Sequence, residues 1–331
     1  MPATLTRVRL APVGILGLGH CVPDQVLSNS QLESKVDTSD QWIRSRTGIC
    51  ERRIAPDELC SSDLGFNAAQ QALEQAGLRA EEVELIIVAT LTPDSPMPST
   101  ACRIQQRLGA TRAGAFDLSV ACSGFTYALC VGQQFVASGT YTRVLVVGVD
   151  TLSRITNWED RSTCVLFGDA AGAAVLGPVP EGSGILGFHF GADGSGGELL
   201  HIPAGAGAPS EVRTDHCIHM AGRGVYRFAV QAMGEASIAA LEKSGISPEE
   251  VSLFIPHQAN LRIIEAAARR LNISMDRVFT NVDRYGNTSN GSVPLALWEA
   301  QKQGRIHSGD IVVTVGFGGG LAWCALVMRW L

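Results

Sequence analysis

The sequence has no long apolar run, little charge and few aromatic residues. No stretch of about 18 consecutive apolar residues occurs, so we expect no transmembrane helix. Charged residues make up 18% and aromatic residues 6% of the chain, against 46% hydrophobic residues. A charged share this low disfavours disorder and coiled coil. The formal net charge of −6 also argues against nucleic-acid binding as the main function.

The cysteines do not follow the spacing of zinc sites or of disulfide frameworks. The chain has 9 cysteines, an odd number, and no CxxC pair. We therefore expect small buried thiols, of which one or two at most are reactive. The first ten residues contain no apolar segment typical of a secretory signal. These features together predict a cytoplasmic protein.

A repeat relates the two halves of the 331-residue chain. Residues 72–88 and 240–256 are identical at nine of 17 aligned positions, at an offset of 168 residues. An offset near half the chain length indicates two copies of one unit rather than two unrelated domains. We predict halves at residues 1–180 and 181–331, related by a pseudo-twofold axis.

Short apolar segments without alternation predict buried strands. The segments are residues 85–90, 144–149, 164–167 and 311–315. Such runs are typical of strands that are covered on both faces, and helical segments lie between them. The fold expected from the two copies is an α/β protein with five layers, α/β/α/β/α, that share the middle layer.

Cys122 stands where a strand-like segment changes to a helical one. The apolar residues before it predict a strand, and residues 123–138 predict a helix. At a helix N-terminus, the free N–H groups and the helix dipole favour a thiolate and lower the thiol pKa. We therefore single out Cys122 as the candidate nucleophile, with a buried structural cysteine as the alternative.

Two polar residues of the second half follow comparable strand ends. His257 follows the repeated strand, and its counterpart in the first half is Ala89. Asn287 lies in a Gly-Asn-Thr-Ser segment, which is otherwise typical of a plain turn. Because the pseudo-twofold brings the strand-end loops of both halves together, we expect Cys122, His257 and Asn287 to converge.

A glycine-rich segment, residues 316–320, follows the last of the predicted strands. Glycines let backbone N–H groups approach a ligand closely. A phosphate-binding loop would require a following Lys-Ser or Lys-Thr, which is absent. An oxyanion hole beside a thiolate is the better interpretation.

Six motifs in one order carry a resemblance that covers essentially the whole chain. They are Asp40-Gln-Trp-Ile-Arg-Ser-Arg-Thr-Gly48, Ala121-Cys-Ser-Gly124, Phe167-Gly-Asp-Ala-Ala-Gly172, Pro256-His-Gln-Ala-Asn260, Tyr285-Gly-Asn-Thr-Ser289 and Gly316-Phe-Gly-Gly-Gly320. With these motifs the chain resembles β-ketoacyl-acyl-carrier-protein synthase III, the condensing enzyme that initiates type II fatty-acid synthesis. The resemblance implies a thiolase-like fold.

The resemblance also implies an activity and its residues. A decarboxylating condensation would join an acyl-CoA, with acetyl-CoA as the favoured starter, to malonyl-acyl carrier protein and release CO2 and CoA. Cys122 would carry the acyl group, and His257 and Asn287 would stabilise the enolate. The N–H groups of Cys122 and Gly319 would form the oxyanion hole. No cofactor or metal is implied, because CoA is part of a substrate and phosphopantetheine arrives on the carrier protein.

Further binding residues follow from the same resemblance. Those implied to bind CoA are Trp42, Arg46, Arg161 and Asn260. Arg227, Arg262 and Arg269 are candidates for a basic patch that attracts the acidic carrier protein, although a solvated helix face is an equal alternative. The implied acyl pocket contains Met97, Phe167 and Phe317. A homodimer is also implied, in which residue 97 reaches the partner's pocket.

The chain departs from the family pattern in two places, and other functions remain open. Relatives commonly have Ala-Ala or Ala-Ser where Asn290-Gly291 follows the Asn-Thr-Ser motif, and phenylalanine where Met97 stands. The main alternative is a related acyltransferase or ketosynthase of secondary metabolism with the same Cys-His-Asn set. A Cys-His-His condensing enzyme, a papain-like hydrolase and an inactive scaffold fit the sequence less well.

Overall fold

The computed structural model describes residues 10–331 and contains two mixed β-sheets. The first sheet has the order β1 (Val13–Cys21), β7 (Asp169–Pro178), β6 (Val144–Thr151), β4 (Leu85–Ala89) and β5 (Gly114–Leu118). The second has the order β8 (Gly184–Ala192), β13 (Ala322–Arg329), β12 (Ile311–Gly318) and β11 (Val251–Pro256). Nearly all of the residues in β4, β6, β7 and β12 are buried, as the apolar runs predict.

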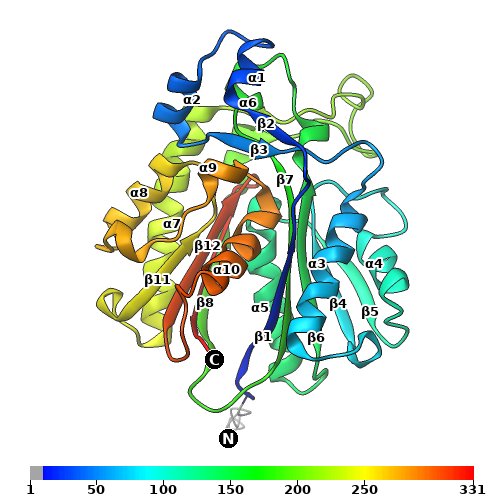
Figure 1. The fold of residues 1–331 in the computed structure, drawn as a ribbon, viewed down its shortest axis with the longest axis vertical. Coiled ribbons are helices and arrows are strands. Elements are labelled where there is room, and N and C mark those ends of the chain that lie inside the picture. Colours follow the sequence, from blue (N-terminus) through cyan, green and yellow to red (C-terminus); the bar gives the residue numbers. More distant parts are fainter. Residues whose placement is uncertain (1–9) are drawn as a thin grey trace, which may run out of the picture.

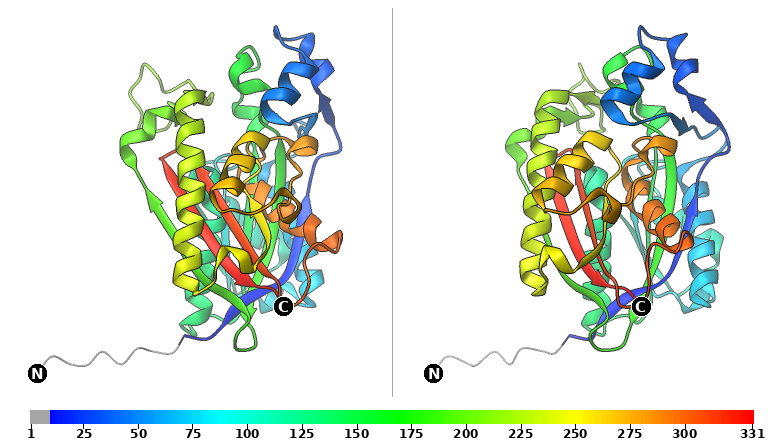
Figure 2. Two further views of the ribbon diagram at one scale, coloured as in Figure 1. Left: turned by 90° about the vertical axis from the view of Figure 1, so that its left-hand side faces the viewer. Right: turned by 60° about the vertical axis from the view of Figure 1, so that its left-hand side comes forward.

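Helices separate and cover the two sheets in five layers (Figure 1). The outer layer on the first sheet holds α3 (Ser61–Ala76) and α4 (Thr100–Leu108). The middle layer holds α5 (Gly124–Ala137) and α10 (Ser292–Lys302), and the other outer layer holds α7 (Gly222–Ser244) and α8 (Leu261–Arg270). Figure 2 shows the long α7 lying along the outer face of the second sheet. The five-layer thiolase-like fold expected from the sequence is therefore present.

The two sheets repeat one pattern of strand directions. In each sheet the first three strands are antiparallel neighbours and the third and fourth are parallel, so that β1, β7, β6 and β4 correspond to β8, β13, β12 and β11. The fifth strand, β5, pairs in parallel with β4, and its counterpart is a single parallel bridge between Phe254 and Val278. This pattern supports the division at residues 180 and 181, which stays a prediction.

The matched segments of the repeat have the same local structure. α3 ends at Gly77 and α7 ends at Gly245, each with a φ of 66°. A 3-10 turn and a strand follow in both halves. The turns are η1 (Ala80–Glu82) and η5 (Pro248–Glu250). Left-handed glycine caps of this kind end helices without steric cost, which is why both copies place glycine there.

Smaller elements gather at one end of the sheets, above the middle layer in Figure 1. They are β2 (Val26–Ser28), α1 (Asn29–Glu33), α2 (Asp40–Thr47), β3 (Glu51–Arg53), α6 (Arg161–Cys164), β9 (Leu200–His201), β10 (His219–Met220) and α9 (Val282–Tyr285). The remaining 3-10 turns are η2 (Ala121–Ser123), η3 (Leu152–Ile155), η4 (Gly194–Leu199), η6 (Met275–Arg277) and η7 (Ser289–Gly291). Three large apolar clusters fill the spaces between the layers.

One of the predicted strands is wrong. Residues 164–167 are not a strand, because Asp160 caps the short helix α6 through a hydrogen bond from the Ser162 N–H. The strand begins only at Asp169. A second difference is that β12 extends beyond Val315 to Gly318.

Two expectations concern membrane insertion and secretion, and the structure tests the first of them. Among residues 10–331, no helix is both long and apolar enough to cross a membrane. The expectation of no secretory signal depends on the first ten residues, nine of which lie outside the described range.

Candidate active site

Cys122 lies on the predicted turn between a strand and a helix. β5 ends at Leu118, the turn η2 contains Cys122, and α5 begins at Gly124. Ala121, just before the cysteine, has a φ of 44°. Few residues other than glycine adopt this backbone conformation, and those that do are concentrated at functional turns.

The glycine-rich end of β12 packs directly against this turn. A Cβ at Gly318 would lie 2.6 Å from the backbone nitrogen of Cys122, and one at Gly316 would lie 3.0 Å from the Cα of Ser123. Only glycine fits at such distances. Gly319, the next residue, lines the same cavity as Cys122. The close approach predicted for the glycine segment is therefore present.

The expectation of a lowered thiol pKa is wrong for the free protein. Cys122 keeps contact with the cavity, but the protein atoms around its sulfur desolvate it and raise the pKa of the thiol to about 12. The neighbouring Ser289 hydroxyl acts in the opposite direction and is outweighed. Burial therefore dominates over the favourable position before α5, and Cys122 is a thiol at neutral pH.

His257 is buried, neutral and held in one orientation. Burial lowers the pKa of its imidazole to about 3. Its Nδ1 lies 2.5 Å from the Ser292 hydroxyl, which also accepts a hydrogen bond from the Gln258 N–H. We assign the Ser292 proton to the bond with Nδ1, and this assignment puts the ring's own proton on Nε2. Nε2 is the nitrogen left to donate to a ligand.

Asn287 is oriented by its own turn. Its Oδ1 accepts a hydrogen bond from the Ser289 N–H at 2.9 Å, which leaves the Nδ2 group free to donate. The Asn287 N–H donates to the Leu166 carbonyl, and the Asn287 carbonyl accepts from the Gly168 N–H. The Asn287 backbone is therefore bonded to the residues on either side of Phe167. The residue as a whole is 8% exposed. A fixed amide donor at this position suits a developing negative charge.

One cavity of about 910 Å³ brings these groups together. Cys122, His257, Asn287 and Gly319 all line it. They come from both halves of the chain, as the pseudo-twofold predicts. Neutral N–H donors that line the same cavity as a thiol can stabilise an oxyanion without a full positive charge.

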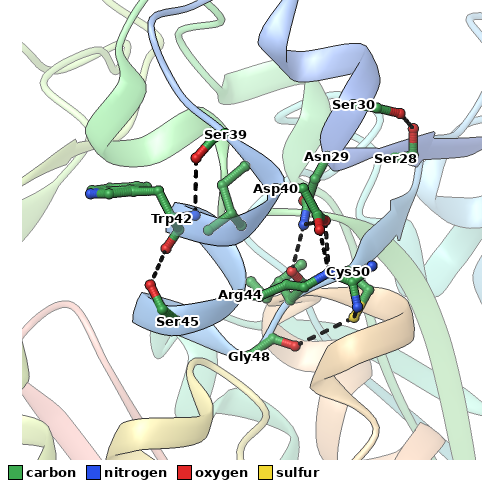
Figure 3. Close-up of polar contacts among 12 residues, drawn as sticks. Ser28, Asn29, Ser30, Ser39, Asp40, Trp42, Arg44, Ser45, Gly48 and Cys50 are labelled. Atoms are coloured by element: carbon green, nitrogen blue, oxygen red, sulfur yellow. Dashed lines mark hydrogen bonds and ion pairs between the residues drawn. The ribbon is translucent and has the colours of Figure 1, made fainter.

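Helix α2 places Trp42 and Arg46 at the same cavity. Figure 3 shows Trp42 pointing away from the contacts that fix this helix, which involve Asp40 and Arg44. The Arg44 Nε bonds both oxygens of Asp40, at 2.7 and 2.8 Å. Arg161 does not line the cavity, but its guanidinium lies over the Trp42 ring at 5.1 Å.

Asn260 lines the cavity, yet its side chain also has a structural role. Its Oδ1 caps α8 by accepting from the Arg262 N–H at 2.9 Å, and its Nδ2 donates to the Arg46 carbonyl at 3.2 Å. The same residue therefore joins α8 to α2. Both elements carry residues implied to bind CoA or the carrier protein.

The predicted acyl-pocket residues fall into two groups. Phe167 and Phe317 line the cavity, whereas Met97 is 86% exposed and lies outside it in this chain. The remaining apolar wall was not predicted from local sequence patterns, and the short strands β9 and β10 and their neighbours supply it. Its members include Leu152, Leu200, Ile202, Ile218 and Met220.

A separate basic groove of about 660 Å³ lies between α7 and α8. Arg227 and Arg262 line it as expected, whereas Arg269 is exposed on α8 outside the lining. Arg223 and Arg270 complete the groove, and sequence reasoning missed Arg223. Arg223 and Tyr226 also line the large cavity, so the two spaces adjoin.

Two models of one family match different parts of the chain. Residues 116–194 match 3-oxoacyl-[acyl-carrier-protein (ACP)] synthase III, and residues 241–330 match the C-terminal part of that family. The β-ketoacyl-[acyl-carrier-protein] synthase III of Caldanaerobacter subterraneus is 53% identical over 322 residues, covering 96% of this chain and 97% of that protein.

Solved structures show the same relationship. The 3-oxoacyl-[acyl-carrier-protein] synthase III of Aquifex aeolicus has a TM-score of 0.91 at 48% identity and covers 96% of this chain and 100% of its own. A priming β-ketosynthase from a polyketide pathway has a TM-score of 0.92 at 36% identity, with 99% and 98% of the two chains covered.

Proposed function

The chain belongs to the β-ketoacyl-acyl-carrier-protein synthase III family, and from that premise we propose how its own residues divide the reaction. The enzyme is an acyltransferase that condenses an acyl-CoA starter with malonyl-acyl carrier protein. CO2 and CoA are released, and the 3-oxoacyl-acyl carrier protein that initiates fatty-acid synthesis is formed. Acetyl-CoA is the starter that we propose.

In the first half-reaction the Cys122 sulfur attacks the thioester carbonyl of the acyl-CoA. The N–H groups of Cys122 and Gly319 hold the resulting oxyanion, supported by the close packing of β12 on the cysteine turn. The carbon–sulfur bond to CoA then breaks. CoA leaves as a thiol with the proton that Cys122 gives up, and the acyl group remains on Cys122.

In the second half-reaction the carrier protein delivers malonyl thioester to the same cavity. The Nε2–H of His257 and the Nδ2–H of Asn287 donate to its carbonyl oxygen, where negative charge develops as CO2 leaves. The enolate carbon attacks the acyl carbonyl on Cys122. The carbon–sulfur bond to Cys122 then breaks, and the thiolate that leaves takes up one proton from solvent.

The observation that carries this proposal is the convergence of one thiol with two oriented neutral N–H donors. A neutral His257 is suited to the task because it donates a hydrogen bond without protonating the enolate. The experiment that tests the function is a panel of acyl-CoA substrates from two to ten carbons, straight and branched, with malonyl-acyl carrier protein. Formation of CO2 that depends on both substrates, and is fastest with acetyl-CoA, is expected; no condensation with any starter would contradict the function.

CoA binding is proposed at the end of the cavity where α2 lies. The Trp42 ring provides a flat apolar surface for the adenine, and Arg161 is already stacked over that ring. Arg46 is exposed at the rim, where a guanidinium can meet the base or a phosphate. Asn260 lines the same cavity as Cys122, and we propose that it contacts the pantetheine.

The basic groove is proposed to dock the carrier protein. It adjoins the cavity, and its arginines would attract an acidic partner although the chain is acidic overall. Arg262→Glu is therefore expected to raise the KM for malonyl-acyl carrier protein by about tenfold, with little change in kcat, since close charge pairs contribute 1.5 kcal/mol or more.

The control for this variant is Arg269→Glu, which reverses a charge on the same helix outside the groove. Steady-state kinetics with the carrier-protein substrate compare the two. Equal effects of both reversals would mean that the groove is not the docking surface. Acylation of a variant by acetyl-CoA at the rate of the parent protein would show that this variant is folded.

A homodimer is proposed through the free edge of the first sheet. β5 pairs only with β4 among the described strands, and its Phe116 is 37% exposed. The loop carrying exposed Met97 lies beside it, because Asp117 of β5 accepts from the Thr100 N–H at 2.7 Å. Light scattering should give twice the 35.0 kDa chain mass, and Phe116→Asp should lower it toward one chain.

Three further features complete the proposal. No cofactor beyond the substrates is required by this scheme. A cytoplasmic location is proposed because a reducing compartment would keep the nine free cysteines as thiols. The alternative in secondary metabolism is not favoured, since the polyketide ketosynthase is 36% identical whereas synthases named for the present reaction reach 53%.

A further inference from the structure

A buried carboxylate lies behind the active site and has no part in the mechanism above. Asp150, at the end of β6, is 0% exposed. Its Oδ1 accepts hydrogen bonds from the Leu91 N–H at 2.6 Å and the Thr90 hydroxyl at 3.1 Å. Its Oδ2 accepts from the backbone N–H and the side-chain Nδ2 of Asn290, at 3.1 and 2.8 Å. Burial raises the pKa of Asp150, and these hydrogen bonds act in the opposite direction without outweighing it.

Asn290 pairs with Asp150 and connects two turns of the active site. These are η2, which contains Cys122 and is called the Cys122 turn below, and η7, which follows Asn287 and is called the Asn287 turn. While its Nδ2 is bound to Asp150, its Oδ1 accepts from the Phe125 N–H in the first turn of α5, at 3.1 Å. One side chain therefore contacts the helix that follows Cys122. The same residue follows Ser289, whose N–H orients the Asn287 amide.

The pseudo-twofold relates Asn290 to a position in the first half of the chain. Turn η2 and turn η7 are 168 residues apart, the offset of the sequence repeat, and each precedes a helix of the middle layer. Ala121 and Ser289, at matched positions, have φ values of 44° and 48°. Asn290 therefore occupies the place in the second half that Cys122 occupies in the first.

The close packing around Asn290 leaves no room for adjustment. A Cβ at Gly124 would lie 2.5 Å from the Asn290 Oδ1, and a Cβ at Gly148 would overlap the Asn290 carbonyl. The turn therefore lies against the backbone of both α5 and β6. A change in the turn cannot be absorbed by movement of flexible side chains alone.

We propose that Asp150 and Asn290 are positioning residues that hold the Asn287 turn against the Cys122 turn and so set the geometry of the condensation step. The Cys122 turn is also supported by the glycines of β12, and the turn after Asn287 is also supported by the packing of Gly291 on the Ala170 backbone. The pair adds the bonds that fix Asn290 itself, which lies three residues after Asn287 in the same turn. We therefore expect loss of the pair to displace the Asn287 amide more than Cys122. The proposal rests on the proposed function and names two further residues for it.

The test separates the two half-reactions in Asn290→Ala and Asp150→Asn. Acylation of Cys122 by acetyl-CoA, followed by intact-protein mass spectrometry, is expected to stay within about threefold of the parent. Decarboxylation of malonyl-acyl carrier protein and kcat for condensation are expected to fall by about 10- to 100-fold, as for a misplacement near 1 Å. KM for the carrier protein should change little.

Two controls distinguish positioning from a loss of stability. Asp169→Asn changes another carboxyl group that is 0% exposed, which accepts hydrogen bonds from the Ala55 and Ser153 N–H groups and not from Asn290. It should lower the Tm and leave the ratio of the two half-reactions unchanged. The double variant Asp150→Asn/Asn290→Asp exchanges the two groups, and it should recover part of the activity that Asp150→Asn loses.

Asn290→Ala keeps the backbone N–H that bonds Asp150, so this variant is expected to fold even if Asp150→Asn does not. Folded Asn290→Ala with an unchanged ratio of half-reactions overturns the proposal, as does a double variant no better than Asp150→Asn. If Asn287→Ala itself keeps decarboxylation, the proposed function of Asn287 fails instead, and the two failures are thereby distinguished.

Discussion

Replacing Cys122 with serine is expected to abolish both acylation by acyl-CoA and condensation, by a factor on the order of a thousand or more. A hydroxyl is far less acidic than a thiol, and the burial that raises the pKa of the Cys122 thiol to about 12 would act against an alkoxide as well. Radiolabelled acetyl-CoA measures the first step, and formation of the 3-oxoacyl product measures the second.

A matched control uses a cysteine outside the cavity. Cys102→Ser changes an exposed thiol on α4 and should leave both activities at the level of the parent protein. If label remained on Cys122→Ser at the parent level, another residue would be the acyl carrier. The two halves of the mechanism would then need a different nucleophile.

Replacing His257 or Asn287 with alanine is expected to give a different pattern. Each removes one N–H donor to the developing enolate, and loss of such a donor costs about 10²- to 10³-fold. Malonyl decarboxylation and condensation should fall by that factor in either variant. Acylation of Cys122 should persist, because the oxyanion hole of that step is formed by backbone N–H groups. Release of CO2 and acylation of the protein are measured separately.

The control for this pair is His307→Ala, which removes a histidine far from the cavity lining whose side chain is 73% exposed. It should leave both half-reactions unchanged. Parent-level decarboxylation in both site variants would show that the two side chains do not stabilise the enolate. Loss of acylation together with decarboxylation would instead place them in the first step.

Much of the fold could be predicted from the sequence, because the signals for it lie within short segments or occur in both halves of the repeat. The repeat at an offset of 168 residues anticipated two sheets with one strand order, and apolar runs anticipated buried strands. Residues 164–167 were predicted incorrectly, because an apolar run does not reveal that Asp160 caps a helix just before it. A helix cap and the strand propensity of an apolar run can favour different structures for the same few residues.

The candidate site shows the same division. Cys122, His257 and Asn287 could be singled out since each follows a strand and a pseudo-twofold must bring strand ends together. The protonation of these groups could not be predicted. The thiol pKa depends on how many protein atoms surround the sulfur, and these come from segments far apart in the chain.

The sequence by itself determined the family, the duplicated architecture and the three side chains that line the reaction cavity. Only the tertiary structure decided that burial keeps His257 neutral, that Met97 lies outside this chain's own cavity, and that Asn290 bonds Asp150. The physical reason is distance along the chain. Asn290 and Asp150 are separated by 140 positions, so nothing in the local pattern around either residue reveals its partner.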